Sequence, residues 1–181
     1  MRIRIDQVIT ANVEEAQAAF LDPAFYASLG ELPGISAPEV RSLSSVPDGA
    51  RAVLGYRFSG QLNGVARAIL DPAKLTWSQI TEVDLATHRS QVRMVPDNYA
   101  GLLSFSGWYD LRPSGIGTCC QHFEANLVVH VPLVGPLAER AIAGSIRQNI
   151  ATTAALVERY VATRRRADGP GPVRGEDDAG D

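Results

Sequence analysis

The sequence has few cysteines, and their positions exclude some kinds of site. Its 181 residues contain two cysteines, Cys119 and Cys120, which are neighbours in a segment with a strand-like pattern. Because successive side chains of a strand point to opposite faces, these thiols should neither pair in a disulfide nor share a metal ion. We therefore interpret each as an inert strand cysteine of a reduced, cytoplasmic protein.

The chain also lacks the patterns that direct a protein to a membrane or to nucleic acid. No apolar run approaches the ~20 residues that span a bilayer. The first residues, MRIRIDQVIT, carry three charges and no continuous apolar stretch, which argues against a signal peptide. A net charge of −3 gives no electrostatic reason to expect nucleic acid or an anionic membrane as partner. The oligomeric state stays open.

The composition is that of one domain followed by a polar tail. A hydrophobic fraction of 45% over 181 residues suits a single globular domain. Residues 164–181, RRRADGPGPVRGEDDAGD, contain one aliphatic residue and are rich in glycine, proline and charge. Such a segment cannot bury enough apolar surface to offset its ordering entropy. We expect a domain over residues 1–163 and a disordered tail over 164–181.

The strongest pattern is a long helix that closes the domain. Between Pro136 and about Arg164 the apolar positions recur at steps of three and four residues, over roughly seven turns of helix. They are Leu137, Ala141, Ile142, Ile146, Ile150, Thr153, Leu156, Val157 and Tyr160, whereas Ala143 falls between them. One apolar stripe of this length needs a large partner surface, and the β-rich residues before it predict a curved antiparallel sheet.

The remaining elements follow one another in a segregated order. A first strand with Ile3, Ile5 and Ile9 on one face is followed by helix 13–21 and a short helix that begins at Asp22-Pro23. Strands are predicted at 39–46, 50–59, 75–83, 86–95, 102–112 and 118–131, and segment 61–70 is either an irregular edge or a short helix. Segregated strands and helices indicate an α+β fold and argue against a doubly wound nucleotide-binding fold.

Four segments carry a resemblance to a known family. They are LDPAFY after the first strand, LTWSQITEVD at 75–84, LSFSGWYDL at 103–111 and VHVPLVGPLAER at 129–140. With this element order, the chain resembles the START-like, or SRPBCC, superfamily, and within it the uncharacterised actinobacterial family DUF2505, over roughly residues 1–163. The resemblance implies a helix-grip fold, with about seven strands around the C-terminal helix and a cavity for lipids, sterols, polyketides or other hydrophobic ligands. It implies no cofactor and no catalytic residue.

A metal site and a nucleophile find little support in the spacing of the residues. His122 and His130 share a strand face but lie eight residues apart, roughly 26 Å along an extended strand, which is too far to share an ion. His122 and Glu124 fall on the polar face of their strand, which we expect to be solvated. A Gly-x-Ser-x-Gly elbow and a glycine-rich phosphate loop are both missing from the sequence.

The predicted concave face offers a candidate ligand pocket. By strand parity and helix phase its lining is Tyr56, Phe58, Trp77, His88, Val92, Met94, Phe105, Tyr109, Phe123, Leu127, Ile146 and Ile150. The tyrosine hydroxyls, His88 and Gln79 would select among ligands, although His88 could equally have a structural role at the rim. A filled core made of the same side chains is the alternative.

Three functional classes fit this sequence. The first is non-catalytic binding of a hydrophobic small molecule, such as a lipid or a polyketide-like or aromatic compound. The second is an enzyme of the polyketide cyclase or aromatase kind, which requires polar side chains that converge inside the cavity. The third is a protein-interaction module, which requires an exposed apolar patch on the outer sheet face. The polar residues on the outer faces of the strands argue against the third.

Overall fold

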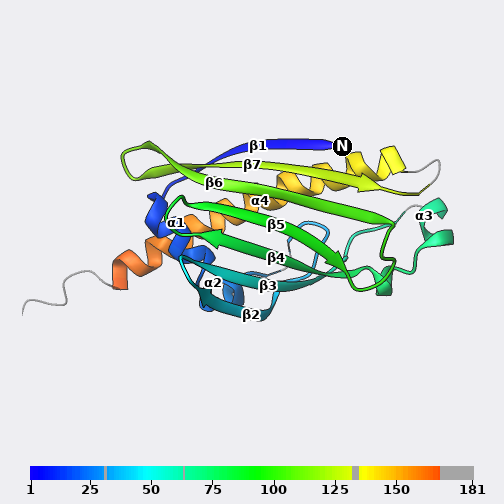
Figure 1. Cartoon of the computed structure of the whole chain (residues 1–181), viewed down its shortest axis with the longest axis horizontal. Helices are drawn as coiled ribbons and strands as arrows, with labels where there is room; N and C mark the ends of the chain where they lie inside the picture. The colour runs from blue at the N-terminus through cyan, green and yellow to red at the C-terminus, as the bar shows by residue number, and fades with distance from the viewer. Residues whose placement is uncertain (31, 63, 132–134, 168–181) are drawn as a thin grey trace, which may run out of the picture.

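A curved antiparallel sheet dominates the computed structural model, which describes residues 1–30, 32–62, 64–131 and 135–167. Its seven strands lie in the order β1-β7-β6-β5-β4-β3-β2. They are β1 (Arg2–Ile9), β2 (Glu39–Val46), β3 (Gly49–Arg57), β4 (Thr76–Asp84), β5 (Arg89–Pro96), β6 (Leu103–Gly115) and β7 (Thr118–Val129). Figure 1 shows the long helix α4 (Gly135–Ala167) crossing one face of this sheet. The predicted α+β helix-grip fold is confirmed.

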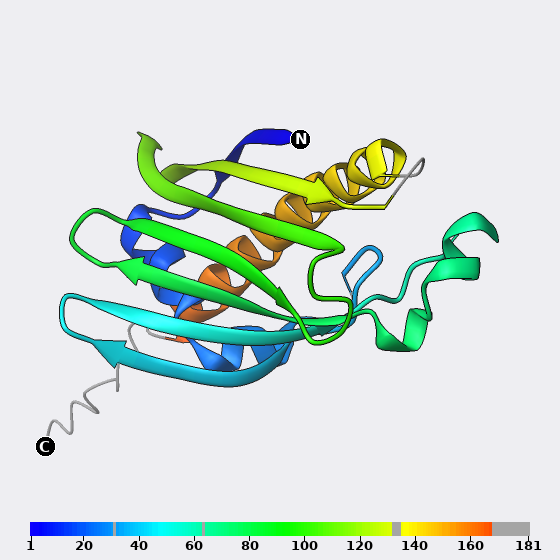
Figure 2. The same cartoon turned by 45° about the vertical axis from the view of Figure 1, so that its right-hand side comes forward.

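Short helices fill the connections. α1 (Val13–Phe20) and α2 (Pro23–Ser28) follow β1 as predicted, and α3 (Gly64–Ile69) and the short 3-10 turn η1 (Pro72–Lys74) join β3 to β4. Segment 61–70 therefore contains a helix rather than an irregular strand. In Figure 2, α3 lies beyond the end of the sheet, while α1 and α2 lie near the C-terminal half of α4.

The buried residues of α4 differ in part from the predicted ones. Leu137, with 59% of its surface exposed, and Ala141 are both exposed, whereas Ala143, Ala154 and Val161 are buried. Alanine occupies two of the buried positions because a small side chain lets a helix backbone lie close to its neighbours. Neither α4, with its 33 residues, nor any other described helix has the apolar stretch needed to cross a membrane.

α4 also extends past the predicted domain boundary. It ends at Ala167, so that the first residues of the predicted tail are helical. Arg165 forms an ion pair with Glu15 of α1, and Arg164 forms one with Asp22 before α2. Residues 168–181, the rest of that tail, lie outside the described residues.

The buried side chains form two clusters, and α4 contributes to both. The first, which we call the end core, comprises Ile9, Ala11, Val13, Ala16, Ala19, Phe25, Leu29, Leu111, Cys119, Ala154, Val157 and Val161. The second, the central core, comprises Ile3, Val92, Phe105, Phe123, Ala125, Leu127 and Ala143. Half-buried Ile5, Met94, Leu103, Tyr109, Val129, Ile142, Ile146 and Ile150 pack against the central core. The candidate site is built on the central core.

β6 and β7 lie close together at Gly107. Gly107 pairs with Ala125 there, and a Cβ atom on Gly107 would lie 2.4 Å from the backbone oxygen of Glu124. Any other residue would therefore force the two strands apart. Glycine at this position also leaves a step in the concave face between Phe105 and Tyr109.

Candidate functional site

Most of the predicted lining residues gather around the central core. Val92, Phe105, Phe123 and Leu127 are buried within it, and Met94, Tyr109, Ile146 and Ile150 pack against it while remaining half-buried. The buried members have no free surface to offer, since they touch one another and α4. The accessible apolar surface belongs to the half-buried members.

Two further aromatic residues extend this surface across β3 and β4. Tyr56 pairs with Trp77 in the strand register, and their rings stack with centroids 5.9 Å apart. Both are half-buried, and neither belongs to the two cores. α4 packs closely on β1, β7 and α1. β1 and β7 lie at one edge of the sheet, away from β3 and β4. The close packing of α4 is therefore on β1, β7 and α1 rather than on β3 and β4, which carry the Tyr56–Trp77 stack.

Phe58 is not brought to this surface. It lies just past the end of β3, where its backbone N–H donates to the carbonyl oxygen of Leu75. Its ring packs on Gly60, since a Cβ there would lie 2.7 Å from that ring. The backbone pairing continues past Arg57, since Phe58 forms a bridge with Ile35, so Phe58 keeps the strand parity while its ring lies against Gly60.

His88 has a specific polar environment rather than an apolar one. It occupies the turn between β4 and β5 with a φ of 53°, a left-handed conformation that is uncommon for histidine. Its Nδ1 donates a hydrogen bond to Oε1 of Gln17 on α1. A residue held in a strained conformation by a specific partner is a feature often found at binding sites.

Three tyrosines from separate elements converge on the interior. They are Tyr26 of α2, Tyr56 of β3 and Tyr109 of β6. Burial raises the pKa of all three phenols, and the proximity of Tyr109 and Tyr56 raises the pKa of Tyr26 further. Tyr26 donates its hydroxyl hydrogen to the carbonyl oxygen of Phe20, at 2.7 Å. These phenols stay neutral at physiological pH and act only through hydrogen bonding.

A small cavity adjoins this tyrosine group. Its volume is about 10 Å³, and it is lined by Gln17, Phe20, Leu21, Val83, His88, Ser90, Tyr109 and Leu111. This is about the space of one water molecule. Nε2 of Gln17 is a buried donor that has no hydrogen-bond partner among the described residues. The cavity is therefore bordered by polar Gln17, His88 and Ser90 as well as by apolar side chains, and one of these polar residues has an unpaired donor.

α4 supplies a second unpaired polar atom. Oδ1 of Asn149 is buried and accepts no hydrogen bond within the described part of the chain. Asn149 lies three residues after Ile146 and directly before Ile150, on the helix face that meets the central core. Each such unpaired group costs free energy unless a water or a ligand satisfies it.

Sequence reasoning missed Gln17, Ser90 and Asn149 as site residues. Two of them nevertheless follow an apolar stripe, since Gln17 comes four residues after Val13 and Asn149 three after Ile146. A polar residue in an apolar stripe was the available signal. Gln79, which was predicted to select ligands, pairs with Leu54 and Met94 on the concave face and is half-buried.

A larger hollow of about 440 Å³ lies elsewhere, at the ends of the β2–β3 and β4–β5 hairpins. It is lined by Val46, Pro47, Asp48, Gly49, Ala50, Arg51, Glu82, Val83, Asp84, Arg89 and Gln91. Charges of both signs line it, and it is open to solvent. Such a lining does not suit a hydrophobic ligand.

The outer face of the sheet is polar in the region predicted to be solvated. Glu124 pairs with Arg2 and Arg4, and Nδ1 of His122 lies 2.6 Å from Oδ1 of Asp6. The two cysteines point to opposite faces as expected. Burial raises the pKa of the Cys119 thiol, in the end core, to about 11, and burial and then Asp6 raise that of Cys120.

Solved structures of similar fold cover almost the whole chain. None of the curated proteins matches the sequence. Norcoclaurine synthase from Thalictrum flavum, a point mutant in complex with a transition-state analogue, is 17% identical, with a TM-score of 0.59 over 91% of this chain and 96% of that one. The Zhui aromatase/cyclase from Streptomyces sp. R1128 is 14% identical, with a TM-score of 0.55 over 96% and 99%.

A START superfamily protein from Mycobacterium smegmatis is 15% identical, with a TM-score of 0.54 over 90% of this chain and 98% of that one. These likenesses establish the START-like fold. The sequence itself matches a family profile described as "Protein of unknown function (DUF2505)" over residues 4–161. The chain therefore belongs to the DUF2505 family and has a START-like fold.

Proposed function

We propose that the protein binds a hydrophobic small molecule, without changing it chemically, on the concave face between β3–β6 and the N-terminal half of α4. The observation that carries the proposal is the half-buried state of Ile146, Ile150, Met94, Tyr56 and Trp77. Side chains this apolar are usually buried completely when they face the interior of a domain. An apolar ligand that covered them would gain about 25 cal/mol per Å² of buried surface.

The unpaired polar atoms support a ligand with polar groups on an apolar body. Oδ1 of Asn149 can only accept a hydrogen bond, and Nε2 of Gln17 can only donate one. A hydroxyl group on the ligand satisfies either atom, and a carbonyl group satisfies Gln17. The phenol of Tyr109, which lines the same small cavity as Gln17, and that of Tyr56 on β3 are neutral and add further hydrogen-bonding groups. Lipids, polyketide-like compounds and aromatic phenols all meet this description.

A second candidate is an enzyme of the polyketide cyclase kind. The observation that favours it is the meeting of His88, Ser90 and Tyr109 at one small cavity, which is the convergence of polar groups that such an enzyme requires. The fold is also that of the Zhui aromatase/cyclase. Against it stands the neutrality of the tyrosines, since burial raises their pKa values and keeps the phenols protonated near neutral pH, so that they cannot accept a proton as general bases.

The test is native mass spectrometry of the full chain purified from its own host, followed by chromatography of the extracted compound. Ile146→Trp fills the space beside the central core, while Leu137→Trp adds the same ring at an exposed position of the same helix and serves as the matched control. We expect the wild type and Leu137→Trp to retain an apolar compound, and Ile146→Trp to lose at least nine-tenths of it.

Several results would contradict the proposal. Wild-type protein that carries no compound and binds no hydrophobic fluorescent probe would reject ligand binding. Equal loss in both tryptophan variants would place the compound elsewhere. Release of the bound compound in a chemically altered form, blocked by Tyr109→Phe but not by Leu137→Trp, would favour the enzyme.

A further inference from the structure

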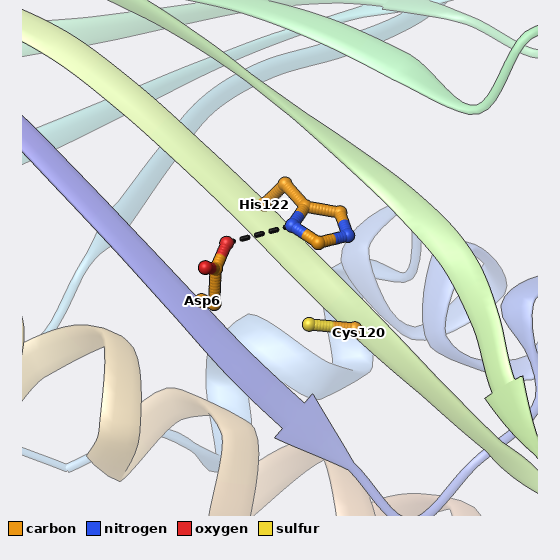
Figure 3. Close-up of side chains that lie close together, drawn as sticks. All are labelled: Asp6, Cys120 and His122. Carbon is orange, nitrogen blue, oxygen red and sulfur yellow. Dashed lines mark hydrogen bonds and ion pairs between the residues drawn. The ribbon is translucent and has the colours of Figure 1, made fainter.

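Three potential metal ligands meet on the outer face of the sheet. Asp6 of β1 and His122 of β7 are cross-strand partners, and Cys120 lies two residues before His122, on the same face of β7. One ligand atom from each residue lies within 4.8 Å of those of the other two. Figure 3 shows the carboxylate, the ring and the thiol grouped beside β1 and β7. This face is opposite α4, because Cys119 points into the end core.

The geometry points to a metal site, and we propose that Asp6, Cys120 and His122 bind a divalent transition-metal ion of the zinc type. Zinc accepts thiolate sulfur, imidazole nitrogen and carboxylate oxygen, at about 2.3, 2.0–2.1 and 2.0–2.2 Å. Tetrahedral angles at these lengths separate ligand atoms by about 3.3–3.6 Å. Small side-chain rotations bring the three atoms to those separations, with a fourth position left for water.

The donor set favours zinc over the alternatives. Magnesium and calcium prefer oxygen ligands alone, whereas a thiol with an imidazole selects softer ions. Cys120 loses its proton to the solvent when it binds the ion. Its thiolate and the Asp6 carboxylate then supply two negative charges, which balance a divalent cation.

A fourth residue, Asp110, is placed to orient the imidazole. It pairs with His122 across β6 and β7, and only 7% of its surface is exposed. Its Oδ2 accepts a hydrogen bond from Arg112, which neutralises its charge, while its Oδ1 has no partner among the described residues. In Figure 3 the second ring nitrogen of His122 lies on the side of the ring away from Asp6, toward β6. A carboxylate that accepts the N–H of a metal-bound histidine fixes the ring and strengthens the ligand.

The same three residues could instead resemble a cysteine nucleophile with a histidine base. That arrangement requires one ring nitrogen to face the carboxylate and the other to face the sulfur. Here Nδ1 faces Asp6, and the view turns the ring carbon between the two nitrogens, not the second nitrogen itself, toward the Cys120 sulfur (Figure 3). The geometry therefore fits three ligands around one ion better than a proton relay.

The site would also secure the edge of the sheet. β1 is the first strand in the sheet order, so that β7 is its neighbour within the sheet. An ion held by Asp6 on β1 and by Cys120 and His122 on β7 links the two strands by coordination bonds. Binding to the folded state alone raises its stability with metal concentration. A shift in melting temperature is therefore a second readout beside the spectrum.

Titration of the metal-free full chain with Co²⁺, and competition by Zn²⁺, tests the site directly. We expect one ion per chain, a thiolate-to-cobalt charge-transfer band, and a higher melting temperature with Zn²⁺. Cys120→Ser should abolish the charge-transfer band, and His122→Gln should weaken binding at least tenfold. Asp110→Asn should weaken it about 10- to 100-fold, as expected for a residue that orients a ligand.

The neighbouring residues provide matched controls. Cys119→Ala removes the adjacent thiol on the opposite face, and His130→Gln removes the exposed histidine beyond the end of the same strand; both should bind Co²⁺ as the wild type does. Absence of binding by folded wild-type protein would overturn the proposal, leaving Asp6–His122 as a surface ion pair. A charge-transfer band that survives in Cys120→Ser, or that is lost in Cys119→Ala, would overturn it as well.

Discussion

The end core and the central core lie along the same helix but are filled to different degrees. In the end core Ile9, Phe25 and Val157 have no exposed surface at all. Beside the central core, Ile146 and Ile150 of the same helix remain half-buried. Half-buried apolar side chains of α4 border both cores, Leu156 and Tyr160 at the end core and Ile142, Ile146 and Ile150 at the central core, but the central core has more such neighbours in total. We therefore expect stability to be concentrated at the end core, and the proposed ligand to bind beside the central core.

The difference has a structural cause. α1 and α2 cover the end core, and Phe25 of α2 makes edge contacts with Phe20 and Tyr160, at centroid distances of 6.2 and 5.4 Å. Polar contacts reinforce this end, since the Tyr160 hydroxyl donates to Asp22 at 2.7 Å. The central core receives α4 on its β1 and β7 side, while the Tyr56–Trp77 stack lies outside both cores.

The largest expected effect is at the centre of the end core. Phe25→Ala removes a fully buried ring and should lower the free energy of unfolding by about 3–5 kcal/mol, because the surrounding aromatic rings can close the space only partly. Urea unfolding at neutral pH measures this change. A loss below about 1.5 kcal/mol, less than half of that lower bound, would mean that the end core is not the main source of stability.

A paired test within α4 compares the two cores directly. Val157→Ala removes fewer atoms than Ile146→Ala, yet we expect it to cost more, about 2 kcal/mol against about 1 kcal/mol. Val157 is fully buried, whereas Ile146 already contacts solvent. Both positions gain the same favourable helix propensity of alanine, which makes the pair well matched. Urea unfolding of the two variants in parallel gives the answer, and the reverse order would reject the comparison.

The element order could be predicted because each element carries its own local pattern. The alternation that places Ile3, Ile5 and Ile9 on one side of β1 predicted which face of that strand meets the interior. The recurrence of apolar residues predicted a long α4. The phase of α4 was partly wrong, since Leu137 is exposed and Ala143 is buried. Hydrophobicity alone does not identify an alanine that is buried because the helix backbone lies close to the sheet. Tertiary packing determines which alanines of the helix are buried.

The polar parts of the sites could not be predicted, because they depend on residues far apart in the chain. Asp6 and His122 are 116 residues apart and meet through the register of β1 and β7. Gln17 and His88 are 71 residues apart and meet through the packing of α1 on a hairpin turn. Strand parity did predict that Cys119 and Cys120 point to opposite faces of β7. Parity does not predict which strand pairs with β7, and therefore which residues lie beside Cys120. The interpretation of Cys120 as inert considered only its neighbours in sequence.

The smallest expected effect concerns the polar contacts that fasten the end core, and it depends on pH. Hydrogen bonds from the Tyr160 hydroxyl and then the Ala24 N–H hold the pKa of Asp22 below its ordinary value of 3.8, with further help from Arg164. A carboxyl group whose pKa is lowered by folding stabilises the protein above its unfolded-state pKa, and this contribution is lost as the pH falls through its folded-state pKa.

Asp22→Asn keeps a good helix N-cap but removes the charge, so it should cost less than about 1 kcal/mol at pH 7. The deficit should be the same at pH 5 and should shrink below the unfolded-state pKa, because the wild-type carboxyl group then becomes neutral as well. Urea unfolding of both proteins across this pH range measures the difference. A deficit that persists at the lowest pH would show that Asp22 acts through its shape and its capping hydrogen bond rather than through its charge.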